Sequence, residues 1–126
     1  MTEGAATSRR RRAWRFGRAA EAVCANVLRL KGYRILAKDV RTPVGEIDIV
    51  ARWGRVLAFI EVKARRSADG NDVIGPRQKR RILRAAEAFM SRRPALANLD
   101  VRFDVMLVTN WALPTHVPDV WRAGEQ

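Results

Sequence analysis

Cysteine and histidine are almost absent from this chain of 126 residues, which contains one of each, Cys24 and His116. One cysteine cannot form an intramolecular disulfide, and this pair cannot supply the ligands of a structural zinc site. Long hydrophobic runs are also missing, because no apolar stretch approaches the roughly 20 residues that a membrane-spanning helix needs. These absences argue against a disulfide scaffold, a zinc module and a membrane span, and we expect a cytoplasmic protein.

Acidic residues are scarce, with 13 Asp and Glu against 25 Lys and Arg, which gives a formal net charge of +12. This excess favours an anionic partner, either nucleic acid or an acidic membrane surface. No amphipathic helix with a large basic face supports the membrane alternative, so we expect nucleic acid and no membrane. The length fits one domain. We predict a disordered basic arm at residues 1–13, a folded domain at 14–121 and a tail at 122–126.

Two neighbouring apolar runs carry acidic residues in their interiors. They span residues 45–50 (Gly-Glu-Ile-Asp-Ile-Val) and 57–63 (Leu-Ala-Phe-Ile-Glu-Val-Lys), and Trp53-Gly54-Arg55 separates them. This pattern predicts a hairpin of two strands with the glycine in the turn. If Gly54 and Arg55 are the central turn residues, Asp48 lies directly opposite Glu61. A shift of the turn by one residue would change this pairing.

Lys63 lies two residues after Glu61, so both side chains point to the same face of the strand. Two interpretations are open: a structural ion pair on a solvated face, or a functional site. Apart from Glu61 and Lys63, both faces of this strand are apolar, which indicates a buried, central strand. A buried carboxylate is costly unless it is paired or binds a metal. We therefore favour a site over a structural salt bridge.

Residues 14–31 have the periodicity of a helix. One apolar stripe is expected to face the core, and it consists of Phe16, Ala20, Val23, Val27 and Leu30. Glu21 lies about one residue off the centre of this stripe, beside Cys24 and Leu28. On helix geometry alone, Glu21 either forms the edge of the polar face or reaches inward towards the carboxylates.

A second helix is predicted to begin at Gly75-Pro76 and to end before Pro94. Its inward face includes Gln78. The dense basic cluster near its start contains no acid, and it consists of Arg77, Lys79, Arg80, Arg81 and Arg84. Such a cluster is either a solvated helix back or a phosphate-binding surface, and Arg65 and Arg66 add two guanidinium groups next to the candidate site.

Further strands are predicted at residues 33–41 and 101–109, with a minor edge segment at 113–121 in which His116 is structural. The order is helix, three strands, helix, strand and edge segment. Tight turns make the first three strands antiparallel, and the second helix acts as a crossover that places the next strand parallel to the third. We therefore predict an α/β domain with a mixed sheet flanked by helices.

Three segments carry a family resemblance, together with the acid on the first helix: Gly45-Glu46-Ile47-Asp48, Phe59-Ile60-Glu61-Val62-Lys63-Ala64-Arg65 and Arg102-Phe103-Asp104-Val105. In this order they resemble the YraN family of bacterial predicted nucleases. That family is similar to the PD-(D/E)xK superfamily, which includes restriction endonucleases and Holliday-junction resolvases. The resemblance extends from about Trp14 to Trp121. Ile47 replaces the proline of the nominal motif, at a position that varies among members.

The resemblance implies a restriction-endonuclease-like αβββαβ core and a magnesium-dependent endonuclease acting on DNA, including branched DNA. Asp48, Glu61 and the backbone carbonyl of Val62 would bind Mg²⁺, which Mn²⁺ could replace, and Lys63 would be the catalytic lysine. Glu21 and Gln78 fall where related nucleases place polar helix residues that assist the site, which favours the inward orientation of Glu21. Resolvase-like members also imply a homodimer. The competing interpretation is a non-catalytic nucleic-acid-binding module that retains the fold.

Overall fold

The computed structural model describes residues 17–65, 74–109 and 113–121, and the predicted arm and tail lie outside these ranges. An N-terminal helix, described over residues 17–30, precedes all other elements. The elements that follow this helix are β1 (Arg34–Thr42), β2 (Gly45–Trp53), β3 (Val56–Arg65), α2 (Pro76–Ser91), the short 3₁₀ turn η1 (Pro94–Leu96), β4 (Asp100–Thr109) and β5 (Thr115–Trp121). Among the described helices, none is long and apolar enough to cross a membrane.

The five strands form one sheet in the order β1-β2-β3-β4-β5. Neighbouring strands are antiparallel except β3 and β4, which are parallel. β3 and β4 are parallel because α2 connects them. The chain leaves the sheet at the end of β3 and crosses back through α2 to the opposite end, where β4 begins. The predicted mixed sheet of an α/β domain is confirmed, and its architecture is consistent with a restriction-endonuclease-like core.

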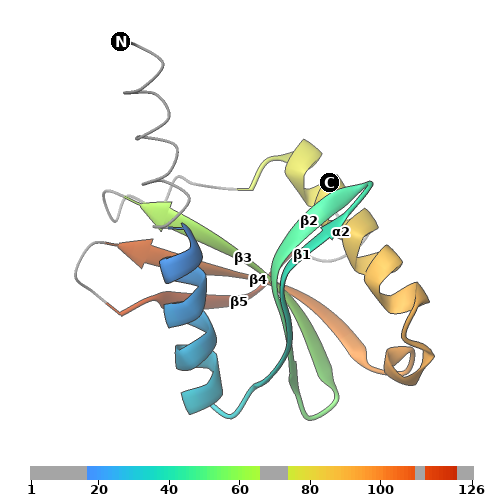
Figure 1. Cartoon of the computed structure of the whole chain (residues 1–126), viewed down its shortest axis with the longest axis horizontal. Helices are drawn as coiled ribbons and strands as arrows, with labels where there is room; N and C mark the ends of the chain where they lie inside the picture. Colours follow the sequence, from blue (N-terminus) through green and yellow to red (C-terminus); the bar gives the residue numbers. More distant parts are fainter. Residues whose placement is uncertain (1–16, 66–73, 110–112, 122–126) are drawn as a thin grey trace.

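The two helices cover opposite faces of the twisted sheet (Figure 1). Under α2, the core is aromatic: Phe59 stacks on Phe103 at 5.8 Å between ring centroids, and Phe103 stacks on Trp121 at 4.9 Å. Under the N-terminal helix, the core contains smaller side chains, including Ala51 and Ala58. β3 is buried on both faces, as the sequence predicts for a central strand.

The N-terminal helix packs on a different stripe from the predicted one. Val23 and Leu30 are 45% and 89% exposed, whereas Cys24 and Leu28 are fully buried. The buried stripe also contains small alanines, and these face the alanines of the sheet, so the helix can approach closely and leave few voids. The prediction of a core stripe through Val23 and Leu30 was therefore wrong. The buried stripe lies one residue further along, on the side of the helix that carries Glu21.

The β2–β3 hairpin has the predicted turn, because Trp53 pairs with Val56 and the register continues to Ile49 and Ile60. The pairing ends there, so Asp48 and Glu61 are not a regular cross-strand pair. Ile47 packs in the core under α2, whereas Ile49 packs under the N-terminal helix. Residues two apart in a regular strand share a face, so β2 twists between them. The strands separate at Asp48.

α2 crosses β2 closely at Gly45. A Cβ atom at Gly45 would clash with the backbone carbonyl of Arg81, whereas a Cβ at Gly17 would meet nothing within 4 Å. Gly45→Ala should therefore destabilise the fold by about 1–3 kcal/mol, the usual cost of overpacking. Chemical denaturation would measure this loss. Gly17→Ala, the control, should stay within about 1 kcal/mol of wild type; equal effects of the two variants would contradict the close crossing.

Candidate active site

A pair of acidic side chains occupies the point where β2 separates from β3. The Val62 N–H donates to Asp48 Oδ2 at 2.8 Å, in place of a backbone partner on β2. The carboxyl groups of Asp48 and Glu61 lie close enough for the charge of Asp48 to raise the pKa of Glu61. Asp48 and Glu61 therefore lie just beyond the last paired residues of β2 and β3, where the two strands separate.

Gln78 on α2 links the acid pair to Lys63. Its Nε2 donates to Glu61 Oε1 at 2.8 Å, and its Oε1 accepts from Lys63 Nζ at 3.2 Å. Lys63 Nζ also lies 3.8 Å from Glu61 Oε1. Because both ends of the amide are engaged, its orientation is fixed by the two partners. The structure therefore brings Gln78, Glu61 and Lys63 into one polar network.

The acid pair has raised proton affinity. Burial, followed by the charge of Asp48, raises the pKa of Glu61 from 4.5 to about 8. Burial also raises the pKa of Asp48, although the hydrogen bond from the Val62 N–H opposes this increase. Two close carboxylates repel each other, so at least one of them is expected to hold a proton more tightly when no cation is present.

Glu21 faces the sheet, on the side of the N-terminal helix that is buried. Burial, with the charges of Asp48 and Asp39, raises the pKa of Glu21 to about 7. Glu21 lines a hollow beside Arg18 and Asp39, next to the acid pair and not in the cleft between β2 and α2. Asp48 acts on Glu21 through its charge, and the two residues line different hollows.

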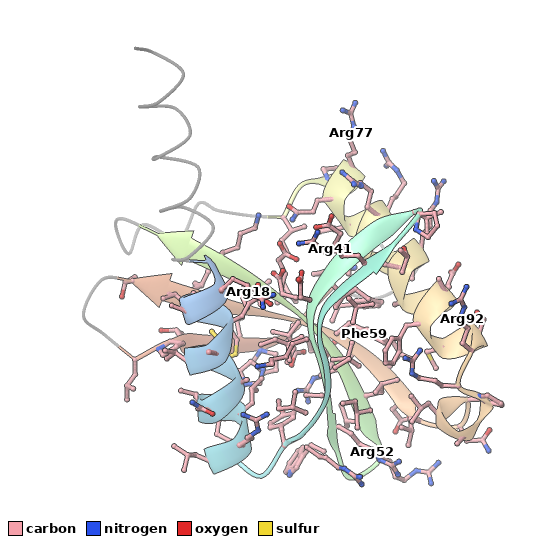
Figure 2. All side chains as sticks on the ribbon, viewed as in Figure 1. Arg18, Arg41, Arg52, Phe59, Arg77 and Arg92 are labelled. Atoms are coloured by element: carbon pink, nitrogen blue, oxygen red, sulfur yellow. The ribbon has the colours of Figure 1, made fainter. Side chains whose placement is uncertain are left out.

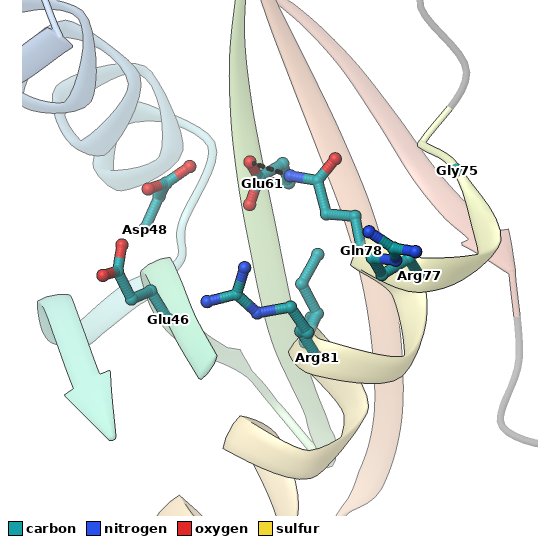
Figure 3. Close-up of a pocket in the computed structure, with 8 residues that line it drawn as sticks. Glu46, Asp48, Glu61, Gly75, Arg77, Gln78 and Arg81 are labelled. Atoms are coloured by element: carbon teal, nitrogen blue, oxygen red, sulfur yellow. Dashed lines mark hydrogen bonds between the residues drawn. The ribbon is translucent and has the colours of Figure 1, made fainter. Parts of the chain in front are cut away.

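A cleft of about 410 Å³ opens beside the acid pair, between β2, β3 and the start of α2 (Figure 3). Glu46, Asp48 and Glu61 contribute carboxylates to its lining, and Arg77 and Arg81 contribute guanidinium groups from successive turns of α2. Figure 3 shows Arg81 extended from α2 towards the acids. The sequence placed Arg81 in a general basic surface and did not reveal that it enters the cleft, because its direction depends on the crossing at Gly45.

The remaining basic residues lie elsewhere. Lys79 extends over the ring of Trp121, with Nζ 5.8 Å from the ring centroid. Arg80 and Arg84 are exposed and do not line the cleft. Arg65 ends β3, and Arg66 lies outside the described residues. The predicted basic cluster therefore divides into two residues in the cleft and others around it.

The donor set fits a hard divalent cation. No three His, Cys, Asp or Glu side chains within residues 17–65, 74–109 and 113–121 form a group that could hold a metal ion. Mg²⁺, however, usually keeps several waters and takes only one or two carboxylates from the protein. Asp48 and Glu61 meet that requirement, and the raised pKa of each marks a place where a cation would compete with H⁺.

A second polar cluster lies away from the cleft and holds β5 to β4. Asp104 is fully buried and accepts hydrogen bonds from Arg102, from His116 Nε2 at 2.7 Å and from the Asp119 N–H at 2.9 Å. Burial alone would raise the pKa of Asp104, but these hydrogen bonds outweigh it and lower the pKa. Lys31 Nζ lies 2.7 Å from His116 Nδ1, so this nitrogen accepts and Nε2 carries the proton. The Arg-Phe-Asp-Val segment therefore has a structural role, because the hydrogen bonds of Asp104 hold β5 against β4.

Comparison with known proteins gives one consistent relationship. The model of the uncharacterised protein family UPF0102 matches residues 20–108. A UPF0102 protein of Paramagnetospirillum magneticum is 50% identical over 115 residues, covering 87% of this chain and 89% of the relative. A UPF0102 protein of Parvibaculum lavamentivorans is 49% identical over 111 residues, covering 87% of this chain and 84% of the relative. The resemblance to the YraN family is confirmed, and the chain belongs to this family, UPF0102.

Proposed function

We propose that this protein is a metal-dependent endonuclease that hydrolyses phosphodiester bonds of DNA. The observation that carries the proposal is the partly buried pair of acids, Asp48 and Glu61, which lines an open cleft and is connected through Gln78 to Lys63. A purely structural ion pair has no need for a second carboxylate, because Lys63 alone would neutralise Glu61. The excess acid at an open cleft is the feature that a cation would compensate.

Hydrolysis adds water to phosphorus and breaks one bridging P–O bond, while negative charge grows on the phosphate oxygens. Asp48, Glu61 and the carbonyl of Val62 would hold Mg²⁺, or Mn²⁺, which would polarise the phosphate and lower the pKa of a bound water. Lys63 would orient the attacking water or offset the charge that develops on the phosphate. Gln78 would hold Lys63 and Glu61 in position through its two hydrogen bonds.

Glu21 would assist indirectly. Its carboxyl acts on Asp48 through charge, and its own pKa of about 7 means that it changes protonation near neutral pH. A proton held on Glu21 would lower the negative charge beside Asp48, and loss of that proton would strengthen the attraction for a cation.

The basic residues of α2 would hold the nucleic-acid backbone. Arg77 and Arg81 would contact the phosphate in the cleft, because guanidinium groups bind phosphate oxygens well. Lys79, Arg80 and Arg84, with Arg65 and Arg66, would contact neighbouring phosphates. This division follows from the two cleft-lining residues and from the exposed positions of Arg80 and Arg84.

Replacing both Arg80 and Arg84 by glutamine tests the exposed part of this surface. If each contacts a phosphate, the slope of log affinity against log salt should become shallower by about two units. Fluorescence anisotropy with labelled duplex DNA in EDTA would measure the slope without cleavage. An unchanged slope would return these two residues to an ordinary solvated helix face.

The proposed activity is tested by a cleavage screen with purified protein. Single-stranded, duplex, flap and four-way-junction DNA would each be incubated with Mg²⁺ or Mn²⁺, and we expect cleavage that includes the branched substrates. Binding of branched DNA without any cleavage would instead favour the non-catalytic binding module that retains the nuclease fold.

Two further predictions accompany the proposed activity. We expect a homodimer, as implied by resolvase-like nucleases, which would place two clefts on one symmetric junction. Sedimentation velocity with and without a four-way junction would show it. We also propose a cytoplasmic location, where a net charge of +12 would meet DNA directly.

A further inference from the structure

A second hollow of about 330 Å³ lies between β1 and the C-terminal half of α2. Its inner wall is apolar and includes Val40 and Phe89, and its charged lining residues are Arg41, Arg92 and Arg93. No acid lines it, whereas three acids line the cleft. The two hollows therefore differ in kind: the cleft suits a cation, and the second hollow suits an anion with an apolar part.

The three arginines are arranged in different ways. Arg93 lies flat on Phe89, with Cζ 3.7 Å from the ring centroid, and it donates to the Phe89 carbonyl at 3.0 Å. This hydrogen bond satisfies a carbonyl group in the last turn of α2, so Arg93 acts as a helix cap. That contact does not explain the role of Arg92, whose side chain is exposed and makes no hydrogen bond or ion pair with any described residue. Arg41 has a single exposed contact, 3.4 Å from Nε to Asp39.

The turn between β1 and β2 separates the two hollows and is held rigidly. The Thr42 hydroxyl accepts from the Gly45 N–H at 3.0 Å and donates to the Gly45 carbonyl at 2.7 Å. Gly45 in turn packs against the backbone of Arg81. The cleft and the second hollow are thus fixed relative to one another along the same helix.

Figure 2 shows Arg77 near the start of α2, Arg92 near its other end, and Arg41 on the strands beside it. From Arg77 to Arg92 the helix rises by about 22 Å, at about 1.5 Å per residue. Successive phosphates of a duplex strand advance by about 3.4 Å along the axis, so this distance corresponds to roughly six or seven nucleotides. One strand of DNA could therefore reach both hollows.

We infer that the second hollow is a phosphate-binding subsite for nucleic-acid backbone that continues beyond the cleft. Arg41 and Arg92 bind the phosphate oxygens, and the apolar wall packs against the sugar. The nature of the ligand rests on the proposed function. The consequence is a substrate class: an extended polynucleotide that covers both hollows, and not a mononucleotide or dinucleotide.

The test compares two double variants with equal loss of charge. Arg41→Gln/Arg92→Gln removes two of the three arginines that line the second hollow. Arg52→Gln/Arg55→Gln is the control, because these residues contact only backbone carbonyls at the far end of the β2–β3 hairpin. Anisotropy with a labelled duplex of about 12 base pairs, in EDTA across a salt series, gives the affinity of each protein and its salt slope.

We expect the hollow variant to flatten the salt slope by about two units and the control to change it little. Equal slopes for the two variants would overturn the subsite, since the effect would then be one of net charge. The melting temperature of each variant would show whether unfolding contributes to its change in salt slope. Absence of cleavage by wild type would refute the proposed activity without affecting this comparison, whereas failure of wild type to bind the duplex would refute both.

Discussion

Replacing Lys63 by alanine should lower the rate of DNA cleavage by about 100- to 10,000-fold while the protein keeps its fold. The side chain is 30% exposed and contacts Gln78 and Glu61, and it does not hold the Val62–Asp48 contact. Its removal therefore takes away a positive charge from the reacting phosphate and leaves the acid pair in place. Single-turnover cleavage at saturating Mg²⁺ would measure the loss directly.

Arg34→Ala is the matched control, because Arg34 is exposed at the start of β1 and does not line the cleft. It removes the same charge, so it should leave the single-turnover rate within a few-fold of wild type. A contaminating nuclease would survive both substitutions equally. Equal rates for wild type, Lys63→Ala and Arg34→Ala would show that Lys63 takes no part in the chemistry.

Glu61→Gln should stabilise the metal-free protein at pH 8 by about 1–3 kcal/mol, the usual cost of a buried, uncompensated polar group. The native state raises the pKa of Glu61 from 4.5 to about 8, so it binds this proton more tightly than the unfolded chain does. The free energy of unfolding should therefore fall as the pH rises from about 4.5 to about 8. Glutamine resembles the protonated acid and should remove most of that fall.

The stabilisation that Mg²⁺ gives to the folded protein should increase with pH, whereas the stability of the metal-free protein should fall. Mg²⁺ competes with the proton that Glu61 binds, so it should stabilise wild type more at pH 8 than at pH 5 and should release protons on binding. Urea titrations at several pH values, with and without Mg²⁺, would show both effects. Glu87→Gln, at an exposed position on α2, is the control and should retain the wild-type response. An equal Mg²⁺ response in Glu61→Gln would remove Glu61 from the metal site.

The sequence was informative where one local feature determines the geometry. A two-residue turn at Gly54 and Arg55 fixes the pairing of both flanking strands, so the register from Trp53 back to Ile49 was predicted correctly. The second helix was equally well defined, because Pro76 and Pro94 bracket it and Ile82, Ala85 and Phe89 share its buried face. The proximity of Gln78 to Glu61 follows from these two elements.

The sequence was misleading where two faces of one helix are about equally apolar. Hydrophobicity favoured the stripe with Val23 and Leu30, but the sheet opposite is lined by Ala51 and Ala58. A close approach favours small residues on both sides, and only the tertiary partner makes that choice. The same holds for the separation of β2 from β3, which depends on a side-chain contact between Asp48 and the Val62 N–H.

The second hollow had no sequence signal of its own. Arg41 lies about fifty residues from Arg92, and each is one arginine among many in a chain with 25 basic residues. Only the crossing of α2 over the turn at Gly45 brings them together. Clusters that are contiguous in sequence can be predicted, whereas a site assembled from distant segments requires the fold.

The most direct test of the central claim is the Mg²⁺ dependence of cleavage by wild type and by Asp48→Asn, purified in parallel. Asparagine keeps the size of Asp48 and a carbonyl that can accept from the Val62 N–H, but it removes the charge that would hold the cation. Wild type should cleave DNA only when Mg²⁺ or Mn²⁺ is added, and Asp48→Asn should be inactive at every metal concentration. Cleavage by wild type in EDTA, or equal cleavage by the two proteins, would contradict a metal-dependent nuclease built on Asp48 and Glu61.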